Sequence, residues 1–404
     1  MKIESCAFLF RAILSRMFNR KSAQAQLETA LEENPVIALL GPRQCGKSTL
    51  ARQVADHEAK HQDVHWFDLE SASDRAALQQ AELTLKPLTG LVVIDEVQRL
   101  PSLFGTLRPL ADRREKPARF LLLGSASPDI VKGVSESLAG RVGFVDLGGF
   151  NLSEVGVKAL DALWLRGGFP RSFMATSDAA SFRWRTDFIR TFLEQDLPQL
   201  GVRTASETLR RFWTMVAHFH GQVWNAAELA RSLGASEPTA RHYLDLLCGT
   251  FMVRRLQPWH TNLGKRELKA PKVYLRDSGL LHHLLGIRSR SELLSHAKLG
   301  ASWEGFALEQ VLASCGSEDT WYWATHNGAE LDLLLRRGGK NWGVEFKVSD
   351  APEMTKSLHI AMEDLKLERA WVVYPGERRY ALTERIEALP LRQVAQIRAA
   401  IAAT

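Results

Sequence analysis

The stretch VIALLGPRQCGKST, from Val36 to Thr49, decides the fold of this 404-residue chain. Its apolar first part predicts a buried strand, and the following residues match the phosphate-binding pattern G-x-x-x-x-G-K-[ST] at every required position. Two glycines let the backbone bend around a polyphosphate, and the positive end of the next helix adds to the attraction. We expect nucleotide contacts from Gly41, Pro42, Arg43, Gln44, Cys45, Gly46, Lys47, Ser48 and Thr49.

The composition is that of an ordinary globular protein. A hydrophobic content of 45% allows roughly two to four domains with cores of their own. The net charge of +6 permits contact with nucleic acid without requiring it. The four cysteines lie far apart, which predicts neither a zinc site nor disulfides and fits a reducing cytoplasm. No apolar run approaches the ~20 residues that span a bilayer, so we expect no membrane partner.

An acidic pair, Asp95 and Glu96, follows the apolar run Leu91–Ile94. Magnesium-dependent nucleoside triphosphatases place such a pair at the end of a buried strand beside the phosphate loop. Asp95 would hold magnesium together with Ser48, and Glu96 would polarise the water that attacks the γ-phosphate. Adjacent carboxylates are also common where a strand emerges into solvent, but the upstream phosphate loop favours the catalytic interpretation.

Two further residues are candidates for the same site. Ser125 follows the buried strand Phe120–Leu123 and is a candidate γ-phosphate sensor, because ligand-facing groups lie at the carboxyl ends of parallel strands. A helix cap at Ser127 is the alternative. We expect Arg141, at the start of the next strand, near the same edge of the sheet. There it would stabilise the transferred phosphate, within its own subunit or from a neighbouring one, unless it is an ordinary surface arginine.

Helical patterns prevail between residues 150 and 262. Apolar residues at helical spacing predict a helical lid over residues 151–205. The order helix, turn, helix and strand over residues 206–262 predicts a winged helix-turn-helix, whose packing as a lid is the alternative to DNA binding. The outward face of its second helix would carry Ser236, Glu237, Thr239, Arg241 and His242. DNA is a candidate partner of this face, although the acidic residues of the helix weigh against it.

A second group of charged residues lies in the carboxyl-terminal part. The pattern predicts a helix, three strands, a helix and a strand, with Asp332 on one strand and Glu345 and Lys347 on the next. Residues two apart on a strand share a face, so these three side chains would meet, and Glu304 would join them from the first helix. The carboxylates would hold magnesium and Lys347 would activate water. A strand with a polar outer face is the alternative interpretation.

Seven motifs occur in one order along the chain, namely GPRQCGKST, IDEVQRLP, SESLAGR, RGGFP, KAPKVYLRDSGLLHHLLG, ASWEGFALE and GAELDLLL. Over roughly residues 20–390 the sequence resembles the bacterial and archaeal predicted AAA-type ATPases that carry a carboxyl-terminal domain of unknown function. The resemblance implies ATP binding and the strand order 5-1-4-3-2 in the nucleotide domain. The element order of the carboxyl-terminal part resembles the restriction-endonuclease-like nuclease core.

The predicted fold is therefore α/β and multidomain. It comprises an N-terminal extension (1–20), an AAA-type ATP-binding domain (21–150), a helical lid (151–205), a winged helix-turn-helix (206–262) and a nuclease-like domain (263–404). Three functions follow as hypotheses: a magnesium-dependent ATPase that acts as a molecular switch, with DNA as a candidate target; an ATP-gated, metal-dependent nuclease; and a non-catalytic regulator that binds DNA or a protein. The expected cofactors are ATP and Mg²⁺.

Overall fold

The structure is a computed structural model that describes residues 20–114, 117–125, 128–200, 202, 204–260 and 270–403, without the side chains of residues 125 and 128–132. Residues 1–19 of the predicted N-terminal extension lie outside this description. The chain divides into two compact units, Met1–Phe150 with Gly249–Phe251 and Asn151–Cys248 with Met252–Thr404. Within the described ranges, each helix is too short or too polar to cross a bilayer.

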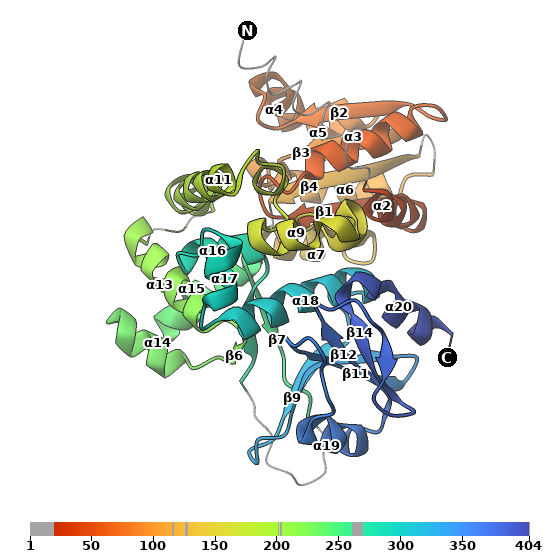
Figure 1. The fold of residues 1–404 in the computed structure, drawn as a ribbon. Coiled ribbons are helices and arrows are strands. Elements are labelled where there is room, and N and C mark those ends of the chain that lie inside the picture. Colours follow the sequence, from red (N-terminus) through yellow and green to blue (C-terminus); the bar gives the residue numbers. More distant parts are fainter. Residues whose placement is uncertain are drawn as a thin grey trace. The chain divides into compact units, whose positions relative to one another are not determined.

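A five-stranded parallel sheet forms the centre of the first unit (Figure 1). Its strand order, β2-β3-β4-β1-β5, confirms the predicted order 5-1-4-3-2 and places β4 between the strand of the phosphate loop and the strand of the acidic pair. The elements of this unit are α2 (Lys21–Glu33), β1 (Val36–Gly41), α3 (Lys47–Glu58), β2 (Val64–Asp68), α4 (Ala72–Gln79), α5 (Ala81–Leu85), β3 (Gly90–Asp95), η1 (Val97–Arg99), α6 (Leu103–Ala111), β4 (Ala118–Ser125), α7 (Pro128–Ser137) and β5 (Val142–Asp146).

The central strands are apolar along their whole length because helices cover both faces of the sheet. All six residues of β1 are buried, as are five of the six in β3. One hydrophobic cluster joins the sheet to α4, α5 and α6, and a second joins its opposite face to α2 and α3. The two layers of helices therefore hold the carboxyl ends of β1 and β3 in a rigid frame.

The second unit begins with helices and a small antiparallel sheet of order β6-β8-β7. Its first elements are α8 (Leu152–Val155), η2 (Val157–Ala159), α9 (Leu160–Arg166), α10 (Pro170–Phe173), α11 (Asp178–Thr191), η3 (Phe192–Asp196), α12 (Leu197–Gln199), α13 (Ser206–His218), β6 (Gln222–Val223), α14 (Ala226–Leu233), α15 (Glu237–Gly249), β7 (Val253–Leu256), β8 (Lys272–Leu275), α16 (Ser278–Leu284) and α17 (Arg290–Ser295). The order from α13 to β8 agrees with the predicted winged helix, which remains a prediction. Strand β8, which the predicted division assigns to the nuclease-like domain, pairs here with β6 and β7.

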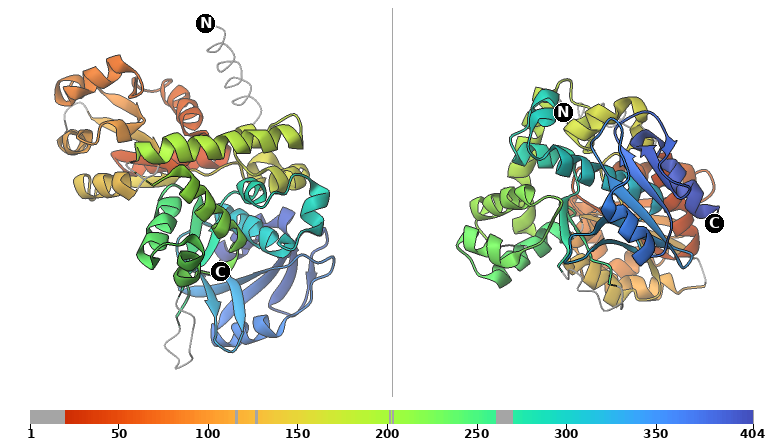
Figure 2. Two further views of the ribbon diagram at one scale, coloured as in Figure 1. Left: turned by 90° about the vertical axis from the view of Figure 1, so that its left-hand side faces the viewer. Right: turned by 60° about the horizontal axis from the view of Figure 1, so that its bottom comes forward.

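The rest of the second unit is a mixed sheet of order β13-β14-β12-β11-β10-β9. Its elements are α18 (Leu299–Cys315), β9 (Thr320–Ala324), β10 (Glu330–Arg337), β11 (Lys340–Phe346), α19 (Lys356–Asp364), β12 (Leu367–Tyr374), β13 (Tyr380–Ala381), β14 (Ile386–Pro390), η4 (Leu391–Gln393) and α20 (Ala395–Ala402). The predicted order of helix, three strands, helix and strand is present from α18 to β12. Figure 1 shows α18 above this sheet and α19 below it, and both views of Figure 2 show α13, α14 and α15 (green) to one side of it.

Two motifs that are far apart in the sequence pack together in the second unit. The carboxylate of Asp277, at the start of α16, accepts hydrogen bonds from the backbone N–H groups of Gly168 (2.7 Å) and Leu280 (2.8 Å). Gly167 has a φ of 78°, and a Cβ atom there would lie 2.2 Å from this carboxylate. Glycine is therefore required in the RGGFP turn, because a side chain would displace Asp277.

A buried polar network joins α9, α16 and α18. The indole N–H of Trp164 donates to the hydroxyl of Ser302 (2.9 Å), and this hydroxyl lies 2.7 Å from Nε2 of His282. Nδ1 of His282 lies 3.0 Å from the carbonyl oxygen of Leu165. Because a carbonyl only accepts, Nδ1 carries the proton and the Ser302 hydroxyl donates to Nε2. Burial lowers the pKa of His282 to about 3, so the ring is neutral at ordinary pH.

Because this network holds a buried neutral histidine, we expect the second unit to lose stability in acid. The unfolded chain protonates His282 below a pH of about 6.5, whereas the folded chain keeps it neutral down to about 3, so stability falls as the pH falls through this window. One such residue lowers the free energy of unfolding by about 2 kcal/mol between pH 7 and pH 5. His282→Gln should therefore be less stable than wild type at pH 7, with a gap that narrows by about this amount at pH 5.

Urea unfolding at the two pH values measures the gap. His359→Gln is the control, because the side chain of His359 is 66% exposed. A gap of equal size at both pH values would contradict the assignment of His282.

Candidate functional site

The phosphate loop connects β1 to α3. Gly46 has a φ of 100°, a conformation that residues with a side chain rarely adopt, and the ammonium group of Lys47 is folded back onto the loop. It donates to the carbonyl oxygens of Gly41 (3.0 Å) and Pro42 (2.9 Å). The Lys47 side chain is almost fully buried, so a desolvated positive charge lies at the centre of the loop. This is the position in which a polyphosphate would be bound.

The other residues of the loop surround this charge. Gln44 is exposed and has a φ of 63°, and Arg43 beside it is half-buried. Cys45 is fully buried, and its thiol lies 3.4 Å from the carbonyl oxygen of Leu147. Thr49 lies in the first turn of α3. The predicted loop residues therefore share one curved segment, and the buried Cys45 anchors it to the sheet.

The structure brings Ser48 and Asp95 together. The hydroxyl of Ser48 lies near enough to the carboxylate of Asp95, at the end of β3, to act on the pKa of that carboxyl, and the backbone N–H of Glu96 donates a hydrogen bond to the same carboxylate (3.0 Å). Burial raises the pKa of Asp95 above its ordinary value, and the neighbouring charges of Glu96 and Asp68 act in the same direction. A hydroxyl and a carboxylate are hard oxygen ligands, so this pair fits the magnesium ion that accompanies nucleoside triphosphates.

Glu96 and Ser125 occupy neighbouring positions at the same edge of the sheet. Glu96 has a φ of 55°, and its carboxylate accepts a hydrogen bond from the side chain of Gln98. Ser125 is the last residue of β4 and lies opposite Gly41 in the parallel register. Its backbone is therefore next to the start of the phosphate loop, as predicted, whereas its side chain lies outside the described atoms.

The expected position of Arg141 is wrong. Parallel strands start at one edge of a sheet and end at the other, and Arg141 precedes β5, whereas the phosphate loop follows the end of β1. The backbone N–H of Val36, the first residue of β1, donates to the carbonyl of Arg141 (3.2 Å). Arg141 is thus separated from the loop by the length of β1, about 17 Å at ~3.3 Å per residue. Its guanidinium group forms two bonds to Asp112, of 2.6 and 2.7 Å, so it has no role at the phosphates of its own subunit.

Arg20 is the last residue of the predicted N-terminal extension, and it contacts the phosphate loop. Its guanidinium group donates to the carbonyl oxygens of Cys45 (3.1 Å), Gly148 (3.2 Å) and Gly149 (3.1 Å). The side chain is almost fully buried and lies over the ring of Phe150. Arg20 therefore ties the loop to the segment that follows β5. No local pattern marks this contact, because these three acceptors of the guanidinium group are distant in the sequence.

In the second unit, the three predicted residues of β10 and β11 lie together. The register pairs Leu333 with Val344, which places Asp332 opposite Glu345. The carboxylate of Asp332 accepts from the backbone N–H of Phe346 (2.9 Å). Lys347, just beyond β11, lies 2.9 Å from the carboxylate of Glu345. The predicted juxtaposition on neighbouring strands is therefore present.

Lys272 was not predicted to join this group. Its ammonium group lies 3.3 Å from Glu304 and 3.5 Å from Asp332, and it also contacts Glu330. In the sequence, the only signal is the alternation in KVYL, which places Lys272 and Tyr274 on one face of a strand. Among the described residues, no three Asp, Glu, His or Cys side chains are arranged to hold a metal ion.

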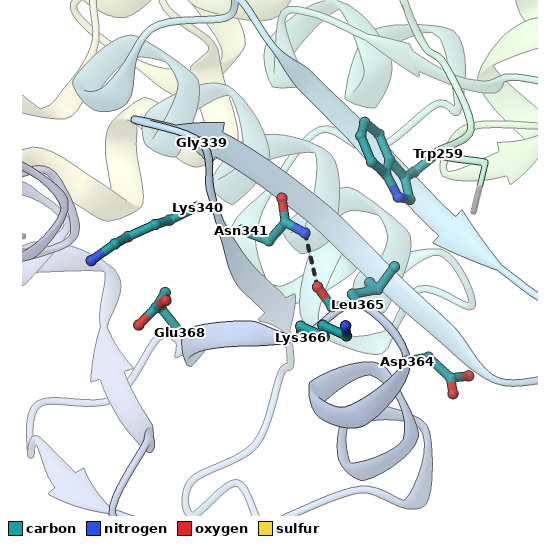
Figure 3. A pocket seen from close by; sticks show the side chains of 8 residues that line it. All are labelled: Trp259, Gly339, Lys340, Asn341, Asp364, Leu365, Lys366 and Glu368. Carbon is teal, nitrogen blue, oxygen red and sulfur yellow. Dashed lines mark hydrogen bonds between the residues drawn. The ribbon is translucent and has the colours of Figure 1, made fainter. Parts of the chain in front are cut away.

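A cavity of about 330 Å³ lies elsewhere in the second unit (Figure 3). Lys340 and Asn341, at the start of β11, line it together with Trp259 and the end of α19, where the Asn341 amide donates to the carbonyl of Leu365 (2.8 Å). Glu345 lies near the opposite end of β11, about five residues or ~17 Å away. This cavity is therefore not the predicted nuclease site.

Sequence comparisons agree with the nucleotide site. Residues 33–156 match the family described as "AAA domain". Uncharacterized protein Rv2008c of Mycobacterium tuberculosis and Uncharacterized protein Mb2031c of Mycobacterium bovis are each 50% identical over 378 residues, which cover 94% of this chain and 85% of the relative. The chain belongs to the same family as these mycobacterial proteins, and its residues 33–156 form an AAA domain. In this family member, residues 157–291 and 299–394 match two domains of unknown function, DUF8612 and DUF4143.

Solved structures also align with this family member. The Walker-type ATPase PABY2304 of Pyrococcus abyssi is 16% identical and aligns over 66% of this chain and 96% of its own, with a TM-score of 0.45. A single-substitution variant of RuvB from Thermotoga maritima is 20% identical over 60% of this chain and 91% of its own, with a TM-score of 0.28. The family assignment rests on the mycobacterial relatives and on the AAA match, because both TM-scores are low.

The packing of the loop predicts the effect of enlarging its first glycine. A Cβ atom at Gly41 would lie 2.1 Å from the carbonyl oxygen of Leu147, so Gly41→Ala must displace the loop from the sheet. We expect the affinity for a fluorescent ATP analogue to fall by about tenfold or more, equivalent to at least ~1.4 kcal/mol.

Gly105→Ala is the matched control, because no atom lies within 4 Å of a Cβ built at this position of α6. It should bind the analogue like wild type and be slightly more stable. Wild-type affinity in Gly41→Ala would show that the loop tolerates the displacement.

Proposed function

We propose that this AAA-type ATPase hydrolyses ATP in a magnesium-dependent reaction and uses the cycle as a molecular switch. The observation that carries the proposal is the buried ammonium group of Lys47 inside the phosphate loop, together with the buried carboxylate of Asp95, which lies near Ser48 at the end of β3. These three groups come from the end of β3 and the start of α3, the helix that follows the phosphate loop after β1. That arrangement suits a nucleoside triphosphate with its metal ion.

Each side chain has one task in the proposed reaction. Lys47 would exchange its loop carbonyls for phosphate oxygens and neutralise the charge that develops on them. Ser48 and Asp95 would hold Mg²⁺, which supplies further neutralisation of the phosphates when it is bound. Glu96 would orient the attacking water and accept its proton, and Ser125 would contact the γ-phosphate.

Arg141 does not take part within its own subunit. To act from a neighbouring subunit, its guanidinium group would first have to leave Asp112, which it contacts through two charge-assisted hydrogen bonds. The proposed hydrolysis therefore relies on the groups of the phosphate loop, β3 and β4 alone.

In the proposed switch, the second unit responds to the nucleotide and binds a protein rather than DNA. On the face of α15 that was predicted to read DNA, Arg241 pairs with Glu237 (3.5 Å), and Asp245 pairs with Arg255 (2.7 Å). These ion pairs reduce the positive charge that DNA phosphates would meet. A protein partner fits this mixed-charge face better than DNA does.

The catalytic assignment predicts a separation of binding from turnover. Lys47→Ala should lose at least about tenfold in ATP affinity, because it removes the charge at the centre of the loop. Glu96→Gln should bind ATP within about twofold of wild type but release phosphate about 100-fold more slowly, because the general base is lost. Equilibrium binding of a labelled ATP analogue and a phosphate-release assay measure the two effects.

Glu82→Gln is the control, since the side chain of Glu82 is 73% exposed and belongs to the same unit. Equal phosphate release by wild type and Glu96→Gln would contradict the proposed base. Absence of release from wild type would favour the non-catalytic regulator instead.

A further inference from the structure

We propose that the ammonium group of Lys272 is the built-in cation of the carboxylate cluster formed by Glu304, Glu330 and Asp332, in the place that a divalent metal ion would take in a nuclease. The second unit would then bind no catalytic metal. This inference concerns a site outside the nucleotide loop and does not depend on the proposed hydrolysis.

The number of donors matches the number of acceptors. An ammonium group carries three N–H donors, and Lys272 contacts three carboxylates. Its side chain is only 5% exposed, so water supplies little of its solvation. The three carboxylates come from α18 and β10, and the lysine comes from β8, so elements distant in the sequence meet at one charged atom. This is the coordination expected of a structural cation.

The carboxylates of the cluster are also bound by other protein donors. The hydroxyl of Tyr274 donates to the same oxygen of Glu304 that Lys272 contacts (2.6 Å). The second oxygen of Asp332 accepts from the backbone N–H of Phe346 (2.9 Å). A magnesium ion would have to displace the ammonium group and compete with these donors, because it needs the lone pairs of the same oxygens.

The remaining predicted residue, Glu345, is likewise satisfied without a metal ion. Its carboxylate lies 2.9 Å from the ammonium group of Lys347 and 3.1 Å from the hydroxyl of Thr355. Thr355 also caps α19 by accepting from the N–H of Leu358 (3.1 Å), which fixes its position. The two lysines therefore partner all four carboxylates of this region.

The backbone of Lys272 cannot move away from the cluster without breaking a sheet. Strand β8 is the central strand of three, and Lys272 is paired with Val223 on one side and Leu256 on the other. Three carboxylates surround its ammonium group, and opposite charges at this range favour the charged form of the lysine. Lys272 therefore remains a charged and immobile member of the site, and its charge repels a second cation.

The test is a titration of the full chain with Mn²⁺, without nucleotide, by electron paramagnetic resonance. Wild type, Asp332→Asn, Lys272→Ala and the double variant are compared, and the nucleotide loop contributes equally to all four because none of the substitutions touches it. We expect wild type and Asp332→Asn to bind the same amount of Mn²⁺. Lys272→Ala should bind one additional equivalent, and Asp332→Asn should abolish that gain in the double variant.

Two results would overturn the proposal. The first is an Mn²⁺ equivalent in wild type that Asp332→Asn removes, and the second is a folded Lys272→Ala that gains none. If circular dichroism shows that Lys272→Ala does not fold, the unfolding temperatures of wild type and Asp332→Asn decide the matter. An equal response of both to millimolar Mn²⁺ supports the proposal, and a rise in wild type alone contradicts it, because a bound ion stabilises the folded state.

Discussion

The second unit depends on the ion pairs that the buried ammonium group of Lys272 forms with three carboxylates. This ammonium group links β8 to α18 and β10, and through them it links a small antiparallel sheet to a six-stranded one. Removal of one partner from such a buried ion group leaves an uncompensated charge, which typically costs about 3–5 kcal/mol. A parallel link, in which Arg254 of β7 donates to Glu309 of α18 (3.0 Å), repeats the same connection. The two domains of unknown function are therefore parts of one folded body.

Backbone hydrogen bonds reinforce this connection. The segment after β7 pairs with β9, where Trp259 donates to the carbonyl of Tyr322 (2.7 Å) and Tyr322 donates to Gln257 (3.0 Å). A movement that separated the elements α13 to β8 from the elements α18 to α20 would break these bonds together with the buried ion pairs. In the proposed switch, the second unit would therefore respond as a whole.

At the nucleotide site, short sequence patterns predict some of the contacts and miss others. The spacing of Gly41, Gly46 and Lys47 predicts a loop whose conformation depends on neighbours in the sequence, and the structure places the Lys47 ammonium inside it. The proximity of Ser48 and Asp95 was also predictable, because carboxyl ends of parallel strands share an edge. The same rule puts Arg141 at the opposite edge, because Arg141 precedes β5, and the expected position of Arg141 did not follow that rule. The contacts of Arg20 are not predictable from local spacing, because the acceptors of its guanidinium group lie up to 129 residues away in the sequence.

The sequence by itself determined the α/β class, the phosphate loop, the acidic pair and the order of elements from α18 to β12, because periodicity, glycine spacing and apolar runs act over a few residues. Only the tertiary structure decided which charges are neutralised and by what. Asp332, Glu345 and Lys347 meet as their strands require, but a metal-binding interpretation needs free carboxylate oxygens, and these are occupied by Lys272, Tyr274 and Thr355. The partners of a buried charge depend on the packing of distant elements, which no local spacing encodes.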